Sequence, residues 1–424
     1  MEEIKVNHLT KIEGHAKLRV KFDRKRKQVK KCSLEVFESP RYFEALIKGR
    51  DFREVPYLAG RICGICNVAH LIGSTLAVED ALGIKVSEQT KLLRELLVLS
   101  GIFHSHVLQI YMLALPDYLG YSSALDMKGK DIKFLKRCLE LKEAGNDVVN
   151  VVGGRSIHPL TSVVGGFTTL PPQNKLNELV KKLRKAKKEA LKTAELFKKL
   201  KTSDFEFKTR FLALEKSGCY PFTEGHLASL SGLIFEPRDY AKYLKEGVVS
   251  ISSAKHVTVK GGSFMVGPLA RLNVNGNMLS QDALLASEGM ELPSYNVFSG
   301  NLARAVETVH CIDRSVEILE TLELREERLL KAGPKEGEGI SATEAPRGTL
   351  FHHYKINKTG KVTAVNIIPP TTQNVKNMEE AVRHFLPGIM GLNKKKMELE
   401  LEKLIRAYDP CMSCSAHFLD LEFL

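Results

Sequence analysis

Two pairs of segments, one pair near each end of the chain, have the residue pattern of β-strands. Residues 16–23 and 28–37 flank a four-residue basic turn, and residues 349–356 and 361–368 flank the turn Asn-Lys-Thr-Gly. Alternating apolar and polar side chains fall on opposite faces of a strand. The sequence therefore predicts one β-hairpin near each end of the chain.

Between and after these hairpins, apolar residues recur every three or four positions, which is typical of helices that bury one face. This spacing predicts seven helices, over residues 92–115, 130–144, 176–200, 237–248, 301–322, 378–385 and 394–407. Glycine-containing turns separate several of them. No internal repeat and no Pro/Ser-rich linker divides the chain. We expect an α+β fold that is predominantly α, with a central bundle of long helices and β pieces at the N- and C-terminal ends.

Composition places the chain among ordinary globular proteins. Its 424 residues are 43% hydrophobic and 27% charged, which excludes a disordered or collagen-like chain. The formal net charge is +13, and residues 175–201 contribute +8 of it. We interpret this segment as an amphipathic helix with a solvated basic face; a docking face for an acidic partner or nucleic acid is the alternative. Abundant Lys and Glu without Trp would suit a thermophile.

The N-terminus carries no pattern of a signal peptide, because it begins with acidic residues and no apolar run follows. The most apolar stretch, residues 92–115, contains Arg94 and Glu95, so a buried helix is favoured over a membrane span. We expect a cytoplasmic protein with reduced cysteines, no direct membrane insertion and no nucleic-acid partner.

Four of the eight cysteines form two C-x-x-C pairs, Cys63/Cys66 and Cys411/Cys414. Four thiolates suit zinc, an iron–sulfur cluster or another soft metal. However, 344 residues lie between Cys66 and Cys411, whereas zinc ribbons place the second pair roughly 15–20 residues on. Structural zinc, a redox or catalytic metal and redox-active disulfides all stay open on spacing alone. We interpret the other cysteines as packing residues; they are Cys32, Cys138, Cys219 and Cys311.

Charged residues and imidazoles flank both pairs. Arg61 precedes the first pair and His70 follows it; Asp409 precedes the second pair and His417 follows it. A structural zinc site needs no such neighbours. A catalytic centre does, because protons must be moved and developing charge stabilised. The surroundings therefore favour catalysis.

Taken together, these motifs resemble the large, catalytic subunit of [NiFe] hydrogenases. The resemblance rests on RICGIC and DPCMSC, and it extends through further motifs in the family's order, nearly end to end. Within that family, the sequence is most similar to the cytoplasmic multi-subunit enzymes that couple H₂ to NAD(P)(H) or polysulfide, such as archaeal sulfhydrogenases. The motifs lie at residues 11–15 (KIEGH), 43–51, 61–66, 154–166, 344–348 (EAPRG) and 409–414.

The resemblance implies a nickel–iron centre held by the four paired cysteines. Cys63 and Cys411 would be terminal nickel ligands, while Cys66 and Cys414 would bridge nickel and iron. CO and cyanide would complete the iron shell. The reaction would be the reversible, heterolytic oxidation of H₂ or reduction of protons.

Further roles follow from the same resemblance. Glu13 would be the first proton relay. Arg347 would polarise the substrate or hold the diatomic ligands, because its pKa is too high for a free base, and Cys411 is the other candidate base. Asp409 would accept hydrogen bonds near the thiolates or pair with Arg347. Ser105 stands where several relatives carry an aspartate, which would alter the hydrogen bonds around Arg347.

A second cation, magnesium or conceivably iron, would be bound by Glu44 and His417. His15 and His70 are expected to be hydrogen-bonding groups around the ligands rather than ligands. Residues 1–417 would form a single hydrogenase large-subunit domain, and residues 418–424 would be a maturation tail removed by an endopeptidase.

Electrons would leave through another polypeptide, because no further cysteine pattern could hold a relay. The implied partners are a small subunit with iron–sulfur clusters and further chains that bind NAD(P) and flavin. Three alternatives remain: a hydrogen-sensing regulatory subunit, the large subunit of a membrane-bound energy-converting hydrogenase, and an unrelated structural zinc protein. Nickel content distinguishes the zinc protein, H₂ turnover distinguishes the sensor, and a membrane-embedded partner would mark the energy-converting enzyme.

Overall fold

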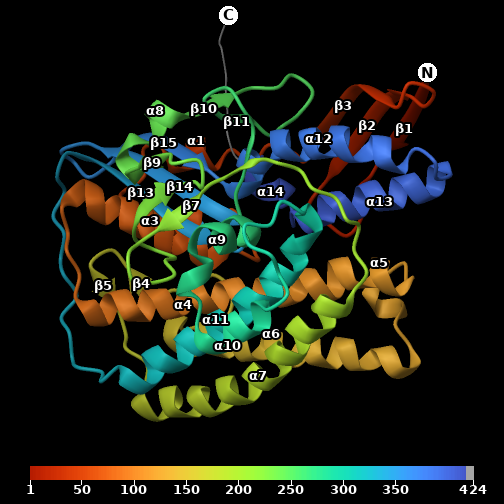
Figure 1. The fold of residues 1–424 in the computed structure, drawn as a ribbon. Coiled ribbons are helices and arrows are strands. Elements are labelled where there is room, and N and C mark those ends of the chain that lie inside the picture. The colour runs from red at the N-terminus through yellow and green to blue at the C-terminus, as the bar shows by residue number, and fades with distance from the viewer. Residues whose placement is uncertain (417–424) are drawn as a thin grey trace, which may run out of the picture.

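The computed structural model describes residues 1–416 of the chain. It begins with an antiparallel sheet of β1 (Glu2–Val6), β2 (Ala16–Asp23) and β3 (Gln28–Val36), in the order β1-β2-β3 (Figure 1). The predicted N-terminal hairpin is confirmed. Strand β2 alternates buried residues with more exposed ones, as a strand with one face on the core does. Helix α12 (Pro370–Ile389) packs against β3.

The second sheet contains the other predicted hairpin. It consists of β13 (Gly337–Ala345), β14 (Gly348–Ile356) and β15 (Val362–Ile368), all antiparallel. The first strand was not predicted. Because Ala345 pairs with Gly348, the chain reverses in a two-residue turn whose second residue is Arg347.

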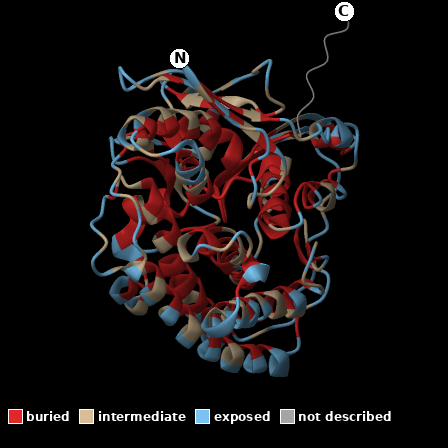
Figure 2. Cartoon of the chain, turned by 90° about the vertical axis from the view of Figure 1, so that its right-hand side faces the viewer, coloured by how far each residue is buried: buried red, intermediate tan, exposed pale blue. Residues whose placement is uncertain are grey.

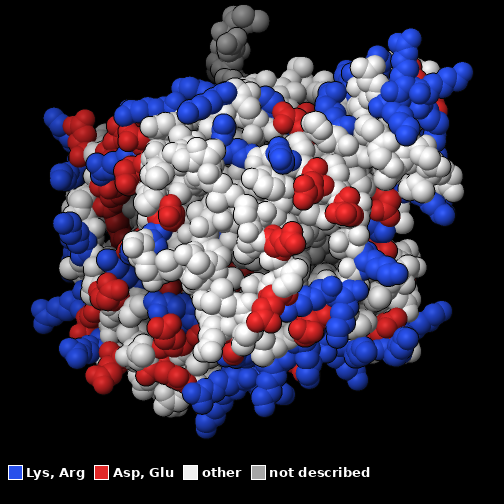
Figure 3. All heavy atoms as spheres, viewed as in Figure 1, with Lys and Arg blue, Asp and Glu red and all other residues white. Residues whose placement is uncertain are grey.

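Long helices form the body of the molecule, as predicted. They are α4 (Glu88–Leu108), α6 (Ile132–Gly153), α7 (Gln173–Lys199) and α11 (Gly300–Thr321), and α11 contacts both α4 and α7. Buried residues fill the space between these helices and the sheets (Figure 2). The outer face of α7 is lined with Lys and Arg along the lower edge of the view in Figure 3. The predicted amphipathic helix is therefore present.

The predicted helix over 394–407 coincides with α13 (Lys394–Ala407), whereas α12 begins eight residues before the predicted start at 378. The helix predicted over 237–248 is wrong. Only Pro237–Asp239 and Tyr240–Tyr243 (α8) are helical, and Leu244–Gly247 (β10) pairs with β11 (His256–Val259). This segment gains its hydrogen bonds from a neighbouring strand, which its own periodicity does not reveal.

Helix α3 (Asn67–Leu82) was missed because it is buried on nearly all sides. Such a helix lacks the polar face on which a periodicity argument depends. The remaining elements are short. They are α1 (Phe43–Ile47), α2 (Val55–Ala59), a π-helix (Gln109–Ala114), α5 (Leu115–Leu119), α9 (Pro268–Asn275), α10 (Gln281–Ser287), α14 (Met412–Ser415), the two-stranded pairs β4 (Ser162–Val163) with β5 (Gly166–Phe167) and β6 (Arg210–Phe211) with β12 (Phe264–Met265), the sheet of β7 (Ala213–Glu215), β8 (His226–Ala228) and β9 (Ile234–Phe235), and 3₁₀ turns at Ala124–Asp126, Gly129–Asp131, Gly276–Met278 and Val297–Ser299.

One helical stretch in the described part of the chain, Glu88–Leu119, is long and apolar enough to cross a membrane. Its apolar window is 83% buried inside the molecule, as in the core helix of a globular protein. Its length and composition are therefore weak evidence for a span.

The backbone of β13 lies directly against α3. A Cβ atom added at Gly337 would lie 2.0 Å from the carbonyl oxygen of Ala81, and one at Gly339 would lie 2.1 Å from that of Ala77. Only glycine allows this approach. The contact holds α3, whose first turn follows Cys66, against the hairpin that carries Arg347.

We therefore expect Gly339→Ala to destabilise the protein by about 1–3 kcal/mol, because the new methyl group meets helix backbone that cannot move aside. Gly388→Ala is the matched control, since a Cβ there meets nothing within 4 Å and the residue is helical; it should stabilise by about 0.5–1 kcal/mol. Denaturant unfolding of both variants measures this. Equal stability of the two variants would contradict the packing argument.

Candidate metal centre

Four cysteine thiols from the two ends of the chain meet in the interior. Cys63 and Cys66 lie between α2 and α3, and Cys411 and Cys414 lie at α14. The Sγ atoms are 3.8 Å apart for Cys63 and Cys411, 3.4 Å for Cys66 and Cys414, and 2.8 Å for Cys411 and Cys414. All four lie within 4.8 Å of one another and are buried. The structure therefore brings together the four residues that the sequence singled out.

The protonation of these thiols is uneven. Contacts with the thiols of Cys411, Cys414 and Cys66 hold the pKa of Cys63 well below its ordinary value, while burial raises the pKa of Cys411 well above it. Four adjacent buried thiolates repel one another unless a cation lies among them. Soft sulfur donors at this spacing fit a thiophilic metal such as nickel, iron or zinc.

Glu13 lies beside the second pair. Its Oε2 is 3.0 Å from the Sγ of Cys411, and the Ser413 hydroxyl donates to its Oε1 over 2.6 Å. Its main chain pairs with the 410–412 segment: the Glu13 amide donates to Pro410, and the Met412 amide donates to Glu13. A carboxylate in this place can exchange a proton directly with the Cys411 sulfur.

Buried ions hold this N-terminal segment in place. Arg406, at the end of α13, donates to Asp117 over 2.6 Å and to the carbonyl and hydroxyl of Thr10. Lys11 forms a second ion pair with the same carboxylate of Asp117. Two residues before Glu13, the chain is therefore fixed to the helix that leads into Asp409.

Arg347 and Asp409 are paired within the interior. Arg347 Nε donates to the Asp409 carbonyl over 2.8 Å, and its Nη2 donates to the Asp409 carboxylate over 3.1 Å. Burial by itself would lower the pKa of Arg347, but Asp409 and the neighbouring cysteine thiolates raise it well above its ordinary value. Arg347 is therefore a permanent cation. The predicted pairing of Asp409 with Arg347 is confirmed.

One nitrogen of this pair, Arg347 Nη1, is placed to bind a group that the chain itself does not supply. Arg347 Nη1 is buried and has no hydrogen-bond partner within residues 1–416, although buried guanidinium donors are nearly always bonded. Arg347 interacts electrostatically with Cys411, Cys66 and Cys63. This nitrogen could therefore donate to an acceptor group on a metal that the thiols bind.

The other predicted residues are distributed as follows. Glu44 accepts a hydrogen bond from the Ile367 amide over 2.8 Å, while His417 lies outside the described residues. His70 is buried in α3 and bonds to His352, whereas His15 is exposed and bonds to His8. Their roles as cation ligands or supporting groups stay predictions.

Ser105 is buried, and within residues 1–416 its hydroxyl has no hydrogen-bond partner. Arg304 from α11 is one residue that sequence reasoning missed: its Nε lies 4.0 Å from the second oxygen of Asp409. Thr371 was also missed; its hydroxyl accepts from the Cys411 amide. The available signal for Arg304 was an arginine among the apolar residues of a helix, which is unfavourable without a buried partner.

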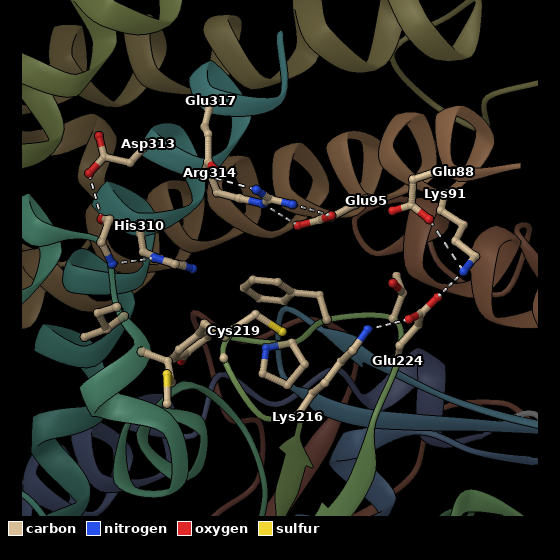
Figure 4. A pocket seen from close by; sticks show the side chains of 18 residues that line it. Glu88, Lys91, Glu95, Lys216, Cys219, Glu224, His310, Asp313, Arg314 and Glu317 are labelled. Carbon is tan, nitrogen blue, oxygen red and sulfur yellow. Dashed lines mark hydrogen bonds and ion pairs between the residues drawn. The ribbon is translucent and has the colours of Figure 1, made fainter. Parts of the chain in front are cut away.

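A separate surface pocket of about 460 Å³ lies between α4, α11 and the 216–224 loop (Figure 4). Several of its charged side chains are paired: Arg314 of α11 with Glu95 of α4, and Lys216 with Glu224 within the loop. Cys219 lines this pocket, apart from the four-thiol group. Within residues 1–416 the four thiols form the one group of possible metal ligands, so we place the candidate site there.

Comparison with known proteins identifies relatives over the whole chain. The family described as nickel-dependent hydrogenase matches residues 41–137 and 238–417. The alpha chain of sulfhydrogenase 1 from Pyrococcus furiosus is 35% identical over 99% of this chain and 98% of that protein. A chain of the F420-non-reducing hydrogenase vhc from Methanococcus voltae is 30% identical over 100% of this chain and 96% of that protein.

Solved structures agree with this. An NAD⁺-reducing [NiFe]-hydrogenase in the H₂-reduced state superposes with a TM-score of 0.89 at 25% identity, over 98% of this chain and 100% of that chain. The Ni-Fe-Se hydrogenase from D. vulgaris Hildenborough gives a TM-score of 0.80 at 25% identity, with the same coverage. The predicted fold is thus confirmed.

We expect Asp117→Asn to destabilise the protein by about 1–3 kcal/mol, because it removes the carboxylate that Arg406 and the partly buried Lys11 share and leaves Arg406 paired with Glu402 alone. Amide exchange of the 11–13 and 410–412 segments should accelerate with it. Unfolding curves and hydrogen exchange test this. Asp239→Asn, which breaks only the exposed pair with Lys242, should lower stability by about 0–1 kcal/mol. A similar loss of stability in both variants would contradict the role of Asp117 in holding the N-terminal segment.

Proposed function

Because the chain belongs to the family of nickel-dependent hydrogenases, we propose that its four buried thiols hold a nickel–iron centre at which H₂ is oxidised reversibly. Family membership makes the chain the catalytic part of a hydrogenase, which is an oxidoreductase that acts on H₂. The observation that supports the location is the convergence of four sulfur atoms within 4.8 Å beside Glu13 and Arg347. It also favours nickel over the structural zinc alternative.

In this proposal Cys63 and Cys411 would hold nickel, and Cys66 and Cys414 would hold both nickel and iron. When bound, the centre supplies the redox chemistry that divides H₂ into two protons and two electrons. Carbon monoxide and cyanide complete the iron shell. The open Nη1 donor of Arg347 is suited to hold the negative end of cyanide, since charge-assisted hydrogen bonds are the strong ones.

Glu13 takes the proton. Its Oε2 lies within hydrogen-bond distance of the Cys411 sulfur, so a proton on that sulfur passes to the carboxylate in one step. The Ser413 hydroxyl and amide hold the carboxylate in place. Glu13 is half-buried, so it is accessible to a group that carries the proton onward.

The second cation and the C-terminal tail remain part of the proposal. Glu44 and His417 bind magnesium, and a maturation endopeptidase removes residues 418–424. Asp409, Cys411 and Cys414 are buried, so the metals would have to enter before this segment packs, and cleavage after metal insertion would fit that order.

Electrons leave through a partner, a small subunit with iron–sulfur clusters. Within residues 1–416 the four-thiol group is the only cluster of possible metal ligands, so the next carrier lies on another chain. The loop that bears the exposed Ile157 and Leu160 fits as the docking face. This loop is bonded to the first cysteine pair's surroundings: the His158 amide donates to Asn67 and its ring bonds to Gly60.

The final acceptor in this proposal is NAD(P) or polysulfide, reached through subunits that bind flavin and NAD(P) in a cytoplasmic complex. The relatives support this choice, because one is a sulfhydrogenase and a matching structure is an NAD⁺-reducing hydrogenase.

Metal analysis of the purified native complex tests the centre. We expect about one nickel per chain together with non-haem iron, and an intact mass that ends at His417. Cys411→Ser should lose the nickel, because a hydroxyl is a hard, protonated ligand. Cys219→Ser, at an exposed cysteine, should keep it. Zinc alone, or nickel retained in Cys411→Ser, would contradict the assignment.

We expect Glu13→Gln to lower H₂ oxidation about 10²–10⁴-fold with unchanged nickel content, because the amide keeps the shape but cannot accept a proton. Glu13→Asp should retain part of the activity. Steady-state H₂ uptake with an artificial acceptor, normalised to nickel, measures both. Full activity of Glu13→Gln would show that the proton leaves by another residue.

A further inference from the structure

Arg271 lies at the centre of a buried ionic cluster behind the turn that carries Arg347. It belongs to α9, which contacts both α11 and β14 (Figure 1), and its side chain is fully buried. Its Nε and Nη2 donate to the two carboxylate oxygens of Glu307, over 2.7 and 2.6 Å. Its Nη1 donates to Glu344 over 2.8 Å.

The same guanidinium also bonds to the main chain of the turn. Nη1 donates to the carbonyl of Ala345 over 3.0 Å, and Nη2 donates to that of Pro346 over 3.4 Å. A guanidinium has five N–H groups, and these five bonds use all of them. The two carbonyls belong to the residues immediately before Arg347, so they set the direction in which that side chain leaves the backbone.

Each carboxylate is held in turn by further donors. Glu307 accepts from the Tyr220 hydroxyl and from His106, each over 2.6 Å. Glu344 accepts from the Leu214 amide and the Thr349 hydroxyl, each over 2.9 Å. The cluster therefore connects the turn to several separate elements, and Arg271 is the member that joins both carboxylates.

The start of α9 is itself shaped around the turn. Gly267, at φ 122°, precedes the helix, and a Cβ there would lie 3.1 Å from the Arg347 carbonyl oxygen. Gly348, at φ 130°, approaches the Gly267 amide so closely that a Cβ would lie 2.7 Å from it. Arg271, one turn into this helix, is thus fixed relative to Arg347 by main-chain packing on both sides.

We propose that Arg271 is a positioning residue for Arg347: it holds the carbonyls of Ala345 and Pro346 and so fixes the Arg347 guanidinium beside Asp409, near the four thiols. A lysine keeps the charge but cannot bond two carboxylates and two carbonyls at once. The inference rests on the proposed function, in which Arg347 acts at the metal centre.

Arg271→Lys in the native complex is the test, and Arg94→Lys is its matched control. Arg94 is also a buried arginine with a bidentate glutamate, Glu79, and a backbone carbonyl, that of Val163. Its bonds involve no residue of the 344–348 turn. Both variants should lose stability to a similar extent, which separates loss of a buried ion pair from loss of positioning.

Three measurements are compared between these variants. For Arg271→Lys we expect turnover about 10- to 100-fold lower, since small misplacement near the chemistry has effects of that size. The infrared stretching bands of the diatomic iron ligands should shift. Amide exchange across 344–350 should accelerate, in the metal-free protein as well as in the loaded complex. Arg94→Lys should leave the bands and the exchange at 344–350 unchanged.

Equal behaviour of the two variants in bands, exchange and turnover would overturn the proposal. If Arg271→Lys does not fold, Glu344→Gln replaces it, because it weakens the same support while leaving the Arg271–Glu307 pair; shifted bands support the proposal and unchanged bands overturn it. Arg347→Lys distinguishes a failure of the proposed role of Arg347 from a failure of the positioning role of Arg271. Unchanged turnover and bands in Arg347→Lys would reject the proposed role of Arg347, whereas a changed Arg347→Lys beside an unaltered Arg271→Lys would reject only the positioning.

Discussion

The packing of four buried thiols within 4.8 Å, two from each end of the chain, is the constraint on which the rest of the structure depends. Residues separated so widely in sequence meet only if the intervening chain is ordered, because closing a loop of that length costs entropy that local contacts must repay. The helical body provides this order. Main-chain pairing of Glu13 with residues 410–412 then closes the N- and C-terminal segments against one another.

Three groups of buried ions support this meeting point. Arg406 with Asp117 holds the N-terminal motif, Arg347 pairs with Asp409 just before the second cysteine pair, and Arg271 with its two glutamates supports the turn that carries Arg347. Buried ion pairs are poor sources of stability because desolvation offsets their attraction. They do fix orientation, most completely for Arg271, whose five N–H groups are all engaged. Orientation is what a proton-transferring metal site requires.

Much of the fold could be predicted from the sequence. The two hairpins and the helix over 394–407 are local structures, in which turn residues and one-sided burial leave a periodic pattern. Helix α3 and strand β10 left no such periodic pattern in the sequence. The first is buried on nearly all sides, and the second exists because β11 lies beside it. A pattern that depends on contact with solvent on one face fails where tertiary packing removes that solvent.

For the site, the sequence by itself determined the candidate residues: two C-x-x-C pairs, the acid of the KIEGH motif, and the arginine and aspartate that accompany them. Residue type and spacing singled out the cysteines but left the metal open, and the resemblance to hydrogenase large subunits added the other three residues. Only the tertiary structure decided that the two pairs form one centre, that Glu13 contacts Cys411 in particular, and that Arg271, Arg304 and Asp117 hold the surroundings. Most of these relations join residues far apart in the chain. The physical reason is that a hydrogen bond or an ion pair depends on distance in space, which the order of residues does not specify until the core is packed.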